Sequence, residues 1–141
     1  MIRFVKFAAL IAVAGLTIAP LTGCKEAATV MANMGGMEGV SKFNDAFAAN
    51  IAANPAVSKF IDPAAADMVK RGVTTSVAKE AGMPIPSDGV DLNSFLKEKN
   101  MDKAGIQGFK DSATKAAKDV ALSPEATKGM TSMLDAALKG L

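Results

Sequence analysis

The chain has 141 residues, with 16 Lys and Arg, 14 Asp and Glu, a single Cys and no His, Tyr or Trp. Because His is the commonest general base and metal ligand, its absence excludes Ser-His-Asp and Cys-His catalytic arrangements and ordinary zinc sites. Lys residues alternate with Asp and Glu along the chain, without the basic stripe that nucleic-acid binding requires. We therefore expect neither an enzyme, nor a metal site, nor a nucleic-acid-binding protein.

Residues 1–23 have the three parts of a secretory signal peptide. Arg3 and Lys6 make a short positive region, and an apolar run follows over residues 8–18. Small residues then precede a cysteine in a sequence that resembles a bacterial lipobox, Leu21-Thr22-Gly23-Cys24. That resemblance implies lipid attachment to Cys24 and cleavage after Gly23. The alternative is an uncleaved membrane helix, since residues 7–23 are at the short limit of the roughly 17–25 residues needed for a span.

Either arrangement tethers the following domain to a membrane of the bacterial cell envelope, facing the periplasm or the exterior. Three acyl chains on Cys24 would anchor it stably, because each buried methylene contributes about 0.8 kcal/mol. Loss of Arg3 and Lys6 on cleavage would leave the remaining chain formally neutral. Cys24 is the only cysteine, so we expect no internal disulfide.

The rest of the chain has the pattern of successive helices, without a β-strand pattern or an internal repeat. A short helix is expected from Glu26 to Met34, ended by two glycines, and a longer one from Met37 to Asn54, ended by the following proline. The longer helix has an apolar stripe at spacings of three, four and four residues, formed by Val40, Phe43, Phe47 and Ile51. A short helical turn follows, with three side chains facing inward: Val57, Phe60 and Ile61.

Asp62-Pro63 predicts the start of the next helix, with Asp62 as N-cap and proline at the first position. This helix should end near Ala81, with Gly82 as the residue that terminates it. Its inward side chains are expected to be Ala66, Val69, Val73 and Val77. Two prolines and a glycine make residues 83–90 an irregular loop.

The segment Asp91–Phe109 lies between two pairs of predicted helices, where ligand sites of helical domains form. The side chains available for chemistry in this segment are Phe95, Leu96, Lys97, Glu98, Lys99 and Met101. None of them is a strong metal ligand. Asp102 is expected to cap a long helix, and Ser123-Pro124-Glu125 to start a last one that runs to about Lys139. The inward faces of these two helices are expected to be Ile106, Phe109, Ala113, Ala116 and Val120, and then Ala126, Met130, Met133, Leu134, Ala137 and Leu138.

This order of breaks and stripes resembles the truncated haemoglobins, a shortened globin fold, from residue 34 to residue 138. Met34-Gly35-Gly36-Met37-Glu38-Gly39 is similar to the family's opening Leu-Gly-Gly-x-x-Gly, and Ala81-Gly82-Met83-Pro84 to its Gly-Gly-Pro loop entry. Met101-Asp102-Lys103-Ala104, followed by Phe109, resembles its Ile-Thr-x-x-x-Phe. The resemblance implies an all-α, two-over-two helical sandwich over residues 34–141, preceded by the anchor and a short helix in residues 24–33.

The positions that carry the family's function are where this chain departs from it. The resemblance places the proximal histidine, which holds the haem iron, at Leu96 and the distal tyrosine at Ala48, directly after Phe47. It places the phenylalanine that wedges the haem at Ile61 and a polar distal residue at Val73. Haem iron is held by His, Cys, Met or Tyr. Substitute ligands would have to come from Met68, Met101, Lys97 or Lys99.

We therefore expect a haem-free, membrane-tethered globin-like lipoprotein that serves as a binding or interaction module for a small apolar ligand or a protein partner, without a cofactor. One alternative is a haem-binding truncated haemoglobin with unusual axial ligation, which handles oxygen or nitric oxide. The other is a structural envelope lipoprotein whose likeness to globins is only helical periodicity. We expect four aromatic side chains to pack the interior rather than contact a cofactor: Phe47, Phe60, Phe95 and Phe109.

Overall fold

The structure is a computed structural model that describes residues 31–141. The predicted signal peptide, the lipobox and Cys24 lie outside the described residues, as does most of the helix expected from Glu26 to Met34. Residues 31–33 are helical. The described part of the chain consists of helices and loops without a strand, which confirms the all-α prediction.

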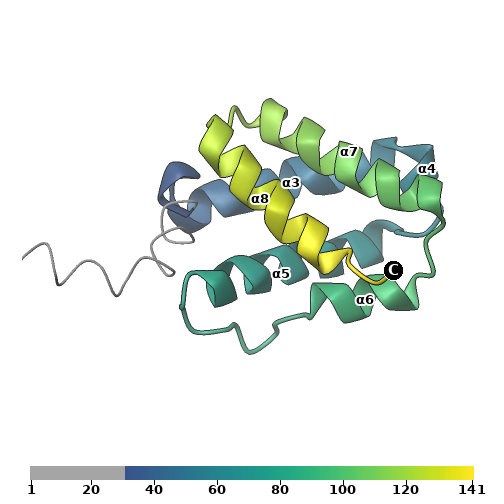
Figure 1. The fold of residues 1–141 in the computed structure, drawn as a ribbon, viewed down its shortest axis with the longest axis horizontal. Helices are drawn as coiled ribbons and strands as arrows, with labels where there is room; N and C mark the ends of the chain where they lie inside the picture. Colours follow the sequence, from purple (N-terminus) through teal and green to yellow (C-terminus); the bar gives the residue numbers. More distant parts are fainter. Residues whose placement is uncertain (1–30) are drawn as a thin grey trace, which may run out of the picture.

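The complete helices follow one another closely in the described chain (Figure 1). Their bounds are α3 Gly36–Ala53, α4 Pro55–Ser58, α5 Pro63–Glu80, α6 Leu92–Glu98, α7 Lys103–Asp119 and α8 Pro124–Ala137. Helix α3 packs against both α7 and α5, while α8 packs on α7 and α6 packs on α5. In this arrangement α3 is the element through which the other helices are joined.

The starts of the helices follow from their capping side chains. Asp62 accepts a 2.7 Å hydrogen bond from the Ala65 amide at the start of α5, and Asp102 accepts one of 2.7 Å from Gly105 at the start of α7. Ser123 caps α8 in the same way. Each satisfies an amide that has no partner within the helix, so the three predicted N-caps are confirmed.

The ends of the helices differ from the predictions by one or two residues. Helix α3 begins at Gly36, one residue before the predicted Met37, and α8 ends at Ala137 rather than Lys139. Helix α5 ends at Glu80, and Gly82 follows in the left-handed conformation with φ 68°, as predicted for the terminating glycine. The segment Asp91–Phe109, in which no helix was predicted before Asp102, contains α6, whose start is capped by Asp91.

The predicted apolar stripe of α3 is fully buried and forms the centre of the core. The Phe47 ring lies 5.5 Å from that of Phe43 and 4.9 Å from that of Phe109 on α7, measured between centroids. Phe60 and Phe95 were expected in the interior, but this is wrong, because both are only partly buried. Each lies at the margin of the core beneath a lysine ammonium group: Lys59 over Phe60 and Lys99 over Phe95.

Helices α4 and α7 approach closely at two glycines of α7. A Cβ atom on Gly108 would lie 2.7 Å from Val57 Cγ2, and one on Gly105 would lie 2.9 Å from Phe60 Cε2. Asn54 adds a 3.2 Å hydrogen bond from its side-chain amide to the Gly108 carbonyl. The absence of side chains at these positions therefore sets the distance between the two helices.

We predict that Gly108→Ala destabilises the fold by about 1–3 kcal/mol, because the added methyl overpacks the contact with Val57. This cost is expected to exceed the gain of about 1 kcal/mol in helix propensity. Chemical denaturation measures it, with Thr114→Ala on the exposed face of α7 as control. A more stable Gly108→Ala variant would contradict the close approach.

A second link between α3 and α7 is polar. The side-chain amide of Asn50, which is 9% exposed, donates to the Ala46 carbonyl at 2.8 Å and to Asp119 Oδ2 at 2.9 Å. Lys115 also contacts Asp119, at 3.1 Å. The hydrogen bond from Asn50, followed by that from Lys115, lowers the pKa of Asp119.

Because its pKa is lower in the folded than in the unfolded chain, Asp119 stabilises the fold above its unfolded value of about 3.9, and this contribution is lost as pH falls through the folded value. We predict that Asn50→Ala raises the pKa of Asp119 toward its ordinary value, measured by NMR titration of the carboxyl carbon. Lys115→Met, which removes the second cause, should raise it less. If Lys115→Met raised the pKa of Asp119 as much as Asn50→Ala or more, the hydrogen bond from Asn50 would not be the main cause of the lowered pKa.

Candidate functional site

The structure brings the predicted pocket positions together. Phe47, Ile61, Val73 and Leu96 all belong to one hydrophobic core, with exposed fractions of 0%, 2%, 0% and 0%. They come from α3, from the turn after α4, from α5 and from α6. Ala48 is half-buried and packs against the same core. These positions are thus filled by side chains that pack in the interior.

Helices α5 and α6 touch where the resemblance would place a haem. The resemblance puts the distal position Val73 on α5 and the proximal position Leu96 on α6, so a haem would lie between the two helices. Directly before Val73, a Cβ atom on Gly72 would lie 2.9 Å from Leu92 Cδ1. Leu92 is one helical turn before Leu96, so the two share a face of α6. A haem could enter only if these helices moved apart.

The substitute axial ligands are poorly placed. Met68 is 36% exposed, Lys97 is exposed, and the Lys99 ammonium lies 5.0 Å from the centre of the Phe95 ring. Met101 is half-buried and packs against the core. Within residues 31–141 there is also no cluster of three His, Cys, Asp or Glu side chains that could hold a metal ion. Leu96 offers no ligand atom, and of the four candidate substitutes only Met101 packs against the core.

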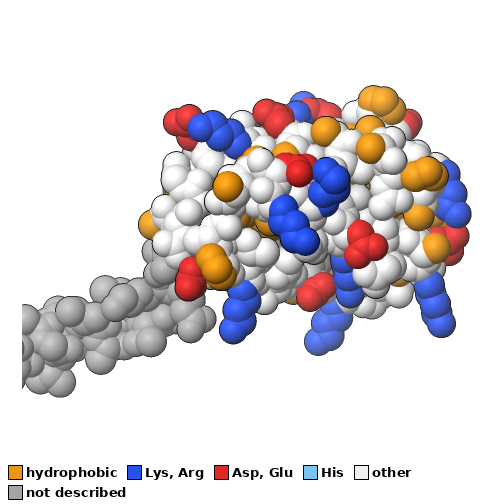
Figure 2. All heavy atoms as spheres, turned by 90° about the horizontal axis from the view of Figure 1, so that it is seen from above, with side chains coloured by type: hydrophobic (Ala, Val, Ile, Leu, Met, Phe, Trp, Pro, Cys, Tyr) orange, Lys and Arg blue, Asp and Glu red, His pale blue; other side chains and the backbone are white. Residues whose placement is uncertain are grey.

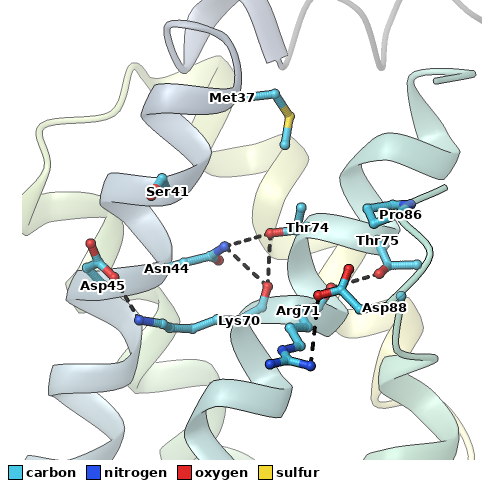
Figure 3. Close-up of a pocket in the computed structure, with 11 residues that line it drawn as sticks. Met37, Ser41, Asn44, Asp45, Lys70, Arg71, Thr74, Thr75, Pro86 and Asp88 are labelled. Atoms are coloured by element: carbon cyan, nitrogen blue, oxygen red, sulfur yellow. Dashed lines mark hydrogen bonds and ion pairs between the residues drawn. The ribbon is translucent and has the colours of Figure 1, made fainter. Parts of the chain in front are cut away.

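A groove of about 360 Å³ lies between α3, α5 and the loop that follows α5 (Figure 3). Most of the residues that line it have polar or charged side chains, although apolar atoms contribute more of its exposed surface. These residues are Met37, Ser41, Asn44, Asp45, Lys70, Arg71, Thr74, Thr75, Pro86, Asp88 and Gly89. None of the five predicted pocket positions lines it. The groove was not predicted from the sequence. One signal was available, because Asn44 lies four residues after Val40 and three before Phe47, on the buried stripe of α3.

The floor of the groove is a hydrogen-bonded network centred on Asn44, which is 4% exposed. Its side-chain amide donates to the Lys70 carbonyl at 3.2 Å and to Thr74 Oγ1 at 3.0 Å, and Thr74 also donates to the Lys70 carbonyl (Figure 3). The Asn44 Oδ1 atom is buried without a protein partner. A buried acceptor without a hydrogen-bond donor costs free energy of folding. Asn44 Oδ1 is therefore the polar atom of the groove whose hydrogen bonding the protein leaves incomplete.

The charges at the rim of the groove neutralise one another. Lys70 pairs with Asp45 at 2.8 Å, and Arg71 pairs with Asp67 at 3.1 Å and with Asp88 at 3.8 Å. On the face shown in Figure 2, basic and acidic side chains are likewise interspersed. Exposed pairs of this kind contribute little to stability. They leave the groove without the excess of one charge that would attract a strongly charged ligand.

Comparisons of the chain with protein-family models, with curated proteins and with solved structures find no match. In the described part of the chain, no helix is long and apolar enough to cross a membrane.

The filled core leads to a prediction for Leu96. We expect Leu96→Ala to destabilise the fold by about 2–5 kcal/mol, because it removes a fully buried side chain and leaves a cavity. Lys97→Ala, at the neighbouring exposed position, is the matched control and should change stability by no more than about 0.5 kcal/mol. Denaturant titration measures both. Equal effects would show that Leu96 does not fill the space between α5 and α6.

Proposed function

We propose that this chain is a membrane-tethered, globin-like lipoprotein with a two-over-two helical sandwich, and that it serves as a haem-free binding or interaction module. The observation that carries the proposal is the direct contact between α5 and α6 at Gly72 and Leu92. The space between the proximal and distal positions is occupied by apolar side chains, and the sequence contains no histidine to hold an iron.

The retained packing supports the globin-like part of the proposal. Phe47 and Ile61, which the resemblance places beside the haem, are core residues together with Val73 and Leu96. Replacement of a polar or ligating group by an apolar one removes the cost of burying an unpaired polar group. A pocket that has lost its cofactor is thereby converted into a packed interior, and the helices can approach one another.

The binding role is then assigned to the surface. A filled interior offers no room for a ligand, whereas the groove lined by Asn44, Thr74 and Thr75 is open and carries a buried acceptor without a protein partner. Ligand sites typically combine a concave shape with a few polar groups that fix orientation. The neutral rim favours an uncharged or zwitterionic group over a strongly charged one.

The test is a haem titration of the full-length protein, followed by absorbance in the Soret region. We predict that the unaltered chain develops no one-to-one Soret band, because it offers no axial ligand and the α5–α6 space is filled. Leu96→His combined with Leu92→Ala restores the family's ligand and also removes the side chain that fills the space beside Gly72, so this double variant should gain a ligated-haem spectrum. Lys97→His in the same Leu92→Ala background, with the histidine at the exposed neighbouring position, is the control and should not gain it.

A one-to-one Soret band in the unaltered chain would contradict the haem-free proposal and favour unusual axial ligation. Its sensitivity to Met68→Ala, Met101→Ala or Lys97→Ala would then identify the ligand. If both histidine variants bind haem equally, Leu96 is not the position that corresponds to the proximal histidine.

A further inference from the structure

Exposed large apolar side chains gather at one end of the domain. Met37, Met83 and Ile85 are 39%, 40% and 57% exposed, and Ile85 is the most exposed large apolar side chain in the described chain. Met37 lies in the first turn of α3, while Met83 and Ile85 belong to the loop after α5. Figure 1 shows the start of α3 and the end of α5 at the same end of the domain, where the described part of the chain also begins. We call these three residues the apolar edge.

The loop that carries two of these residues is held at both ends. The Met83 amide donates to the Ala78 carbonyl at 2.8 Å, and the Val90 amide donates to Thr75 Oγ1 at 3.1 Å. Ile85 stands between Pro84 and Pro86, which restrict the backbone on either side. The exposed Ile85 side chain is therefore presented by a constrained loop, so ordering it on a surface would lose little conformational entropy.

Met37 from α3 and Pro86, the loop residue that directly follows Ile85, line the same groove (Figure 3). The charged residues beside them are paired, Glu38 with Lys42 at 3.0 Å and Arg71 with Asp88 at 3.8 Å. The edge is thus apolar without an excess of positive charge, so a surface that covers it needs apolar character rather than negative charge.

The length of the proposed tether determines which surface lies nearest. Met31 follows Cys24 by seven residues. Even a fully extended chain of that length spans no more than about 25 Å. A domain anchored through Cys24 therefore stays close to the bilayer, and its end nearest residue 31 is the end that carries the apolar edge.

We propose that the apolar edge, Met37, Met83 and Ile85, docks on the surface of the bilayer to which Cys24 is anchored, with Ile85 inserted among the lipid headgroups. This inference rests on the tether of the proposed function and deepens it, because it fixes which face of the domain meets the membrane. Insertion of apolar side chains at the boundary between headgroups and acyl chains is favourable and does not depend on anionic lipid when few cations take part.

The test uses the full-length, processed protein reconstituted in phosphatidylcholine vesicles. Met83→Cys and Ile85→Cys carry an environment-sensitive fluorophore, and a nitroxide-bearing phosphatidylcholine serves as quencher. Met68→Cys is the matched control, because Met68 is also an exposed methionine, at 36%, and lies in the first half of α5, away from the loop. We expect labels at residues 83 and 85 to lose most of their fluorescence and the label at residue 68 to keep it.

Mass spectrometry of the N-terminal peptide and sedimentation with the vesicles separate this proposal from the tether. If the chain is vesicle-bound but the labels at 83 and 85 are quenched no more than the label at 68, the docking is overturned and the tether stands. Labels at 83 and 85 shielded from aqueous iodide, yet unreached by the lipid quencher, would indicate a protein that covers the edge and also overturn it. If Cys24 carries no lipid and the chain does not sediment, both proposals fail.

Discussion

The contact on which the rest of the structure depends is the packing of Phe47 against Phe43 and, edge to face, against Phe109. The Phe47 and Phe109 rings, 4.9 Å apart between centroids, join α3 to α7, and Phe43 lies 5.5 Å from Phe47 on the same helix. All three side chains are fully buried. Aromatic rings bury much apolar area and favour edge-to-face or offset geometry, so this contact sets both the distance and the rotation of the two helices. The other helices are added to this pair: α5 packs on the remaining side of α3, and α8 packs on α7.

The contact between α5 and α6 depends on a small residue rather than on large aromatic ones. Gly72 has no side chain to keep the helices apart, so Leu92 occupies the space beside it and Leu96 packs one turn further along. Interiors are packed to nearly crystalline density, and a haem-sized void lined by apolar groups would forfeit many dispersion contacts. Where no cofactor is to be held, closure of the helices is the state of lower free energy. On the proposed function, the apolar residues Leu96 and Val73 and the short α5–α6 contact are consistent parts of one change.

The elements with strong local signals could be predicted from the sequence. Asp62, Asp102 and Ser123 each combine a capping side chain with a following helix, and the stripe through Phe43 and Phe47 has the period of a helix with one buried face. Helix α6 was not predicted as a helix, because it is short and its position is fixed by tertiary contacts, among them the hydrogen bond from the Asn93 side chain to the Ala137 carbonyl at 2.7 Å. The groove around Asn44 was missed because its residues come from α3, α5 and a loop, and only the fold brings them together.

A filled interior also restricts the positions at which residues can change to bind a new ligand. Core side chains such as Leu96 and Val73 are held by packing, and a change there costs stability before it alters recognition. Surface positions on a rigid scaffold can vary without that cost, which is why binding residues concentrate on loops and rims. In this chain the loop over residues 83–90 contributes to both surface features, the groove and the apolar edge. It borders the groove through Pro86 and Asp88, and it carries Ile85 at the apolar edge. A ligand that entered the groove would therefore contact the same constrained loop that, on our proposal, faces the bilayer, so occupancy of the groove and the position of the domain on the membrane should be coupled.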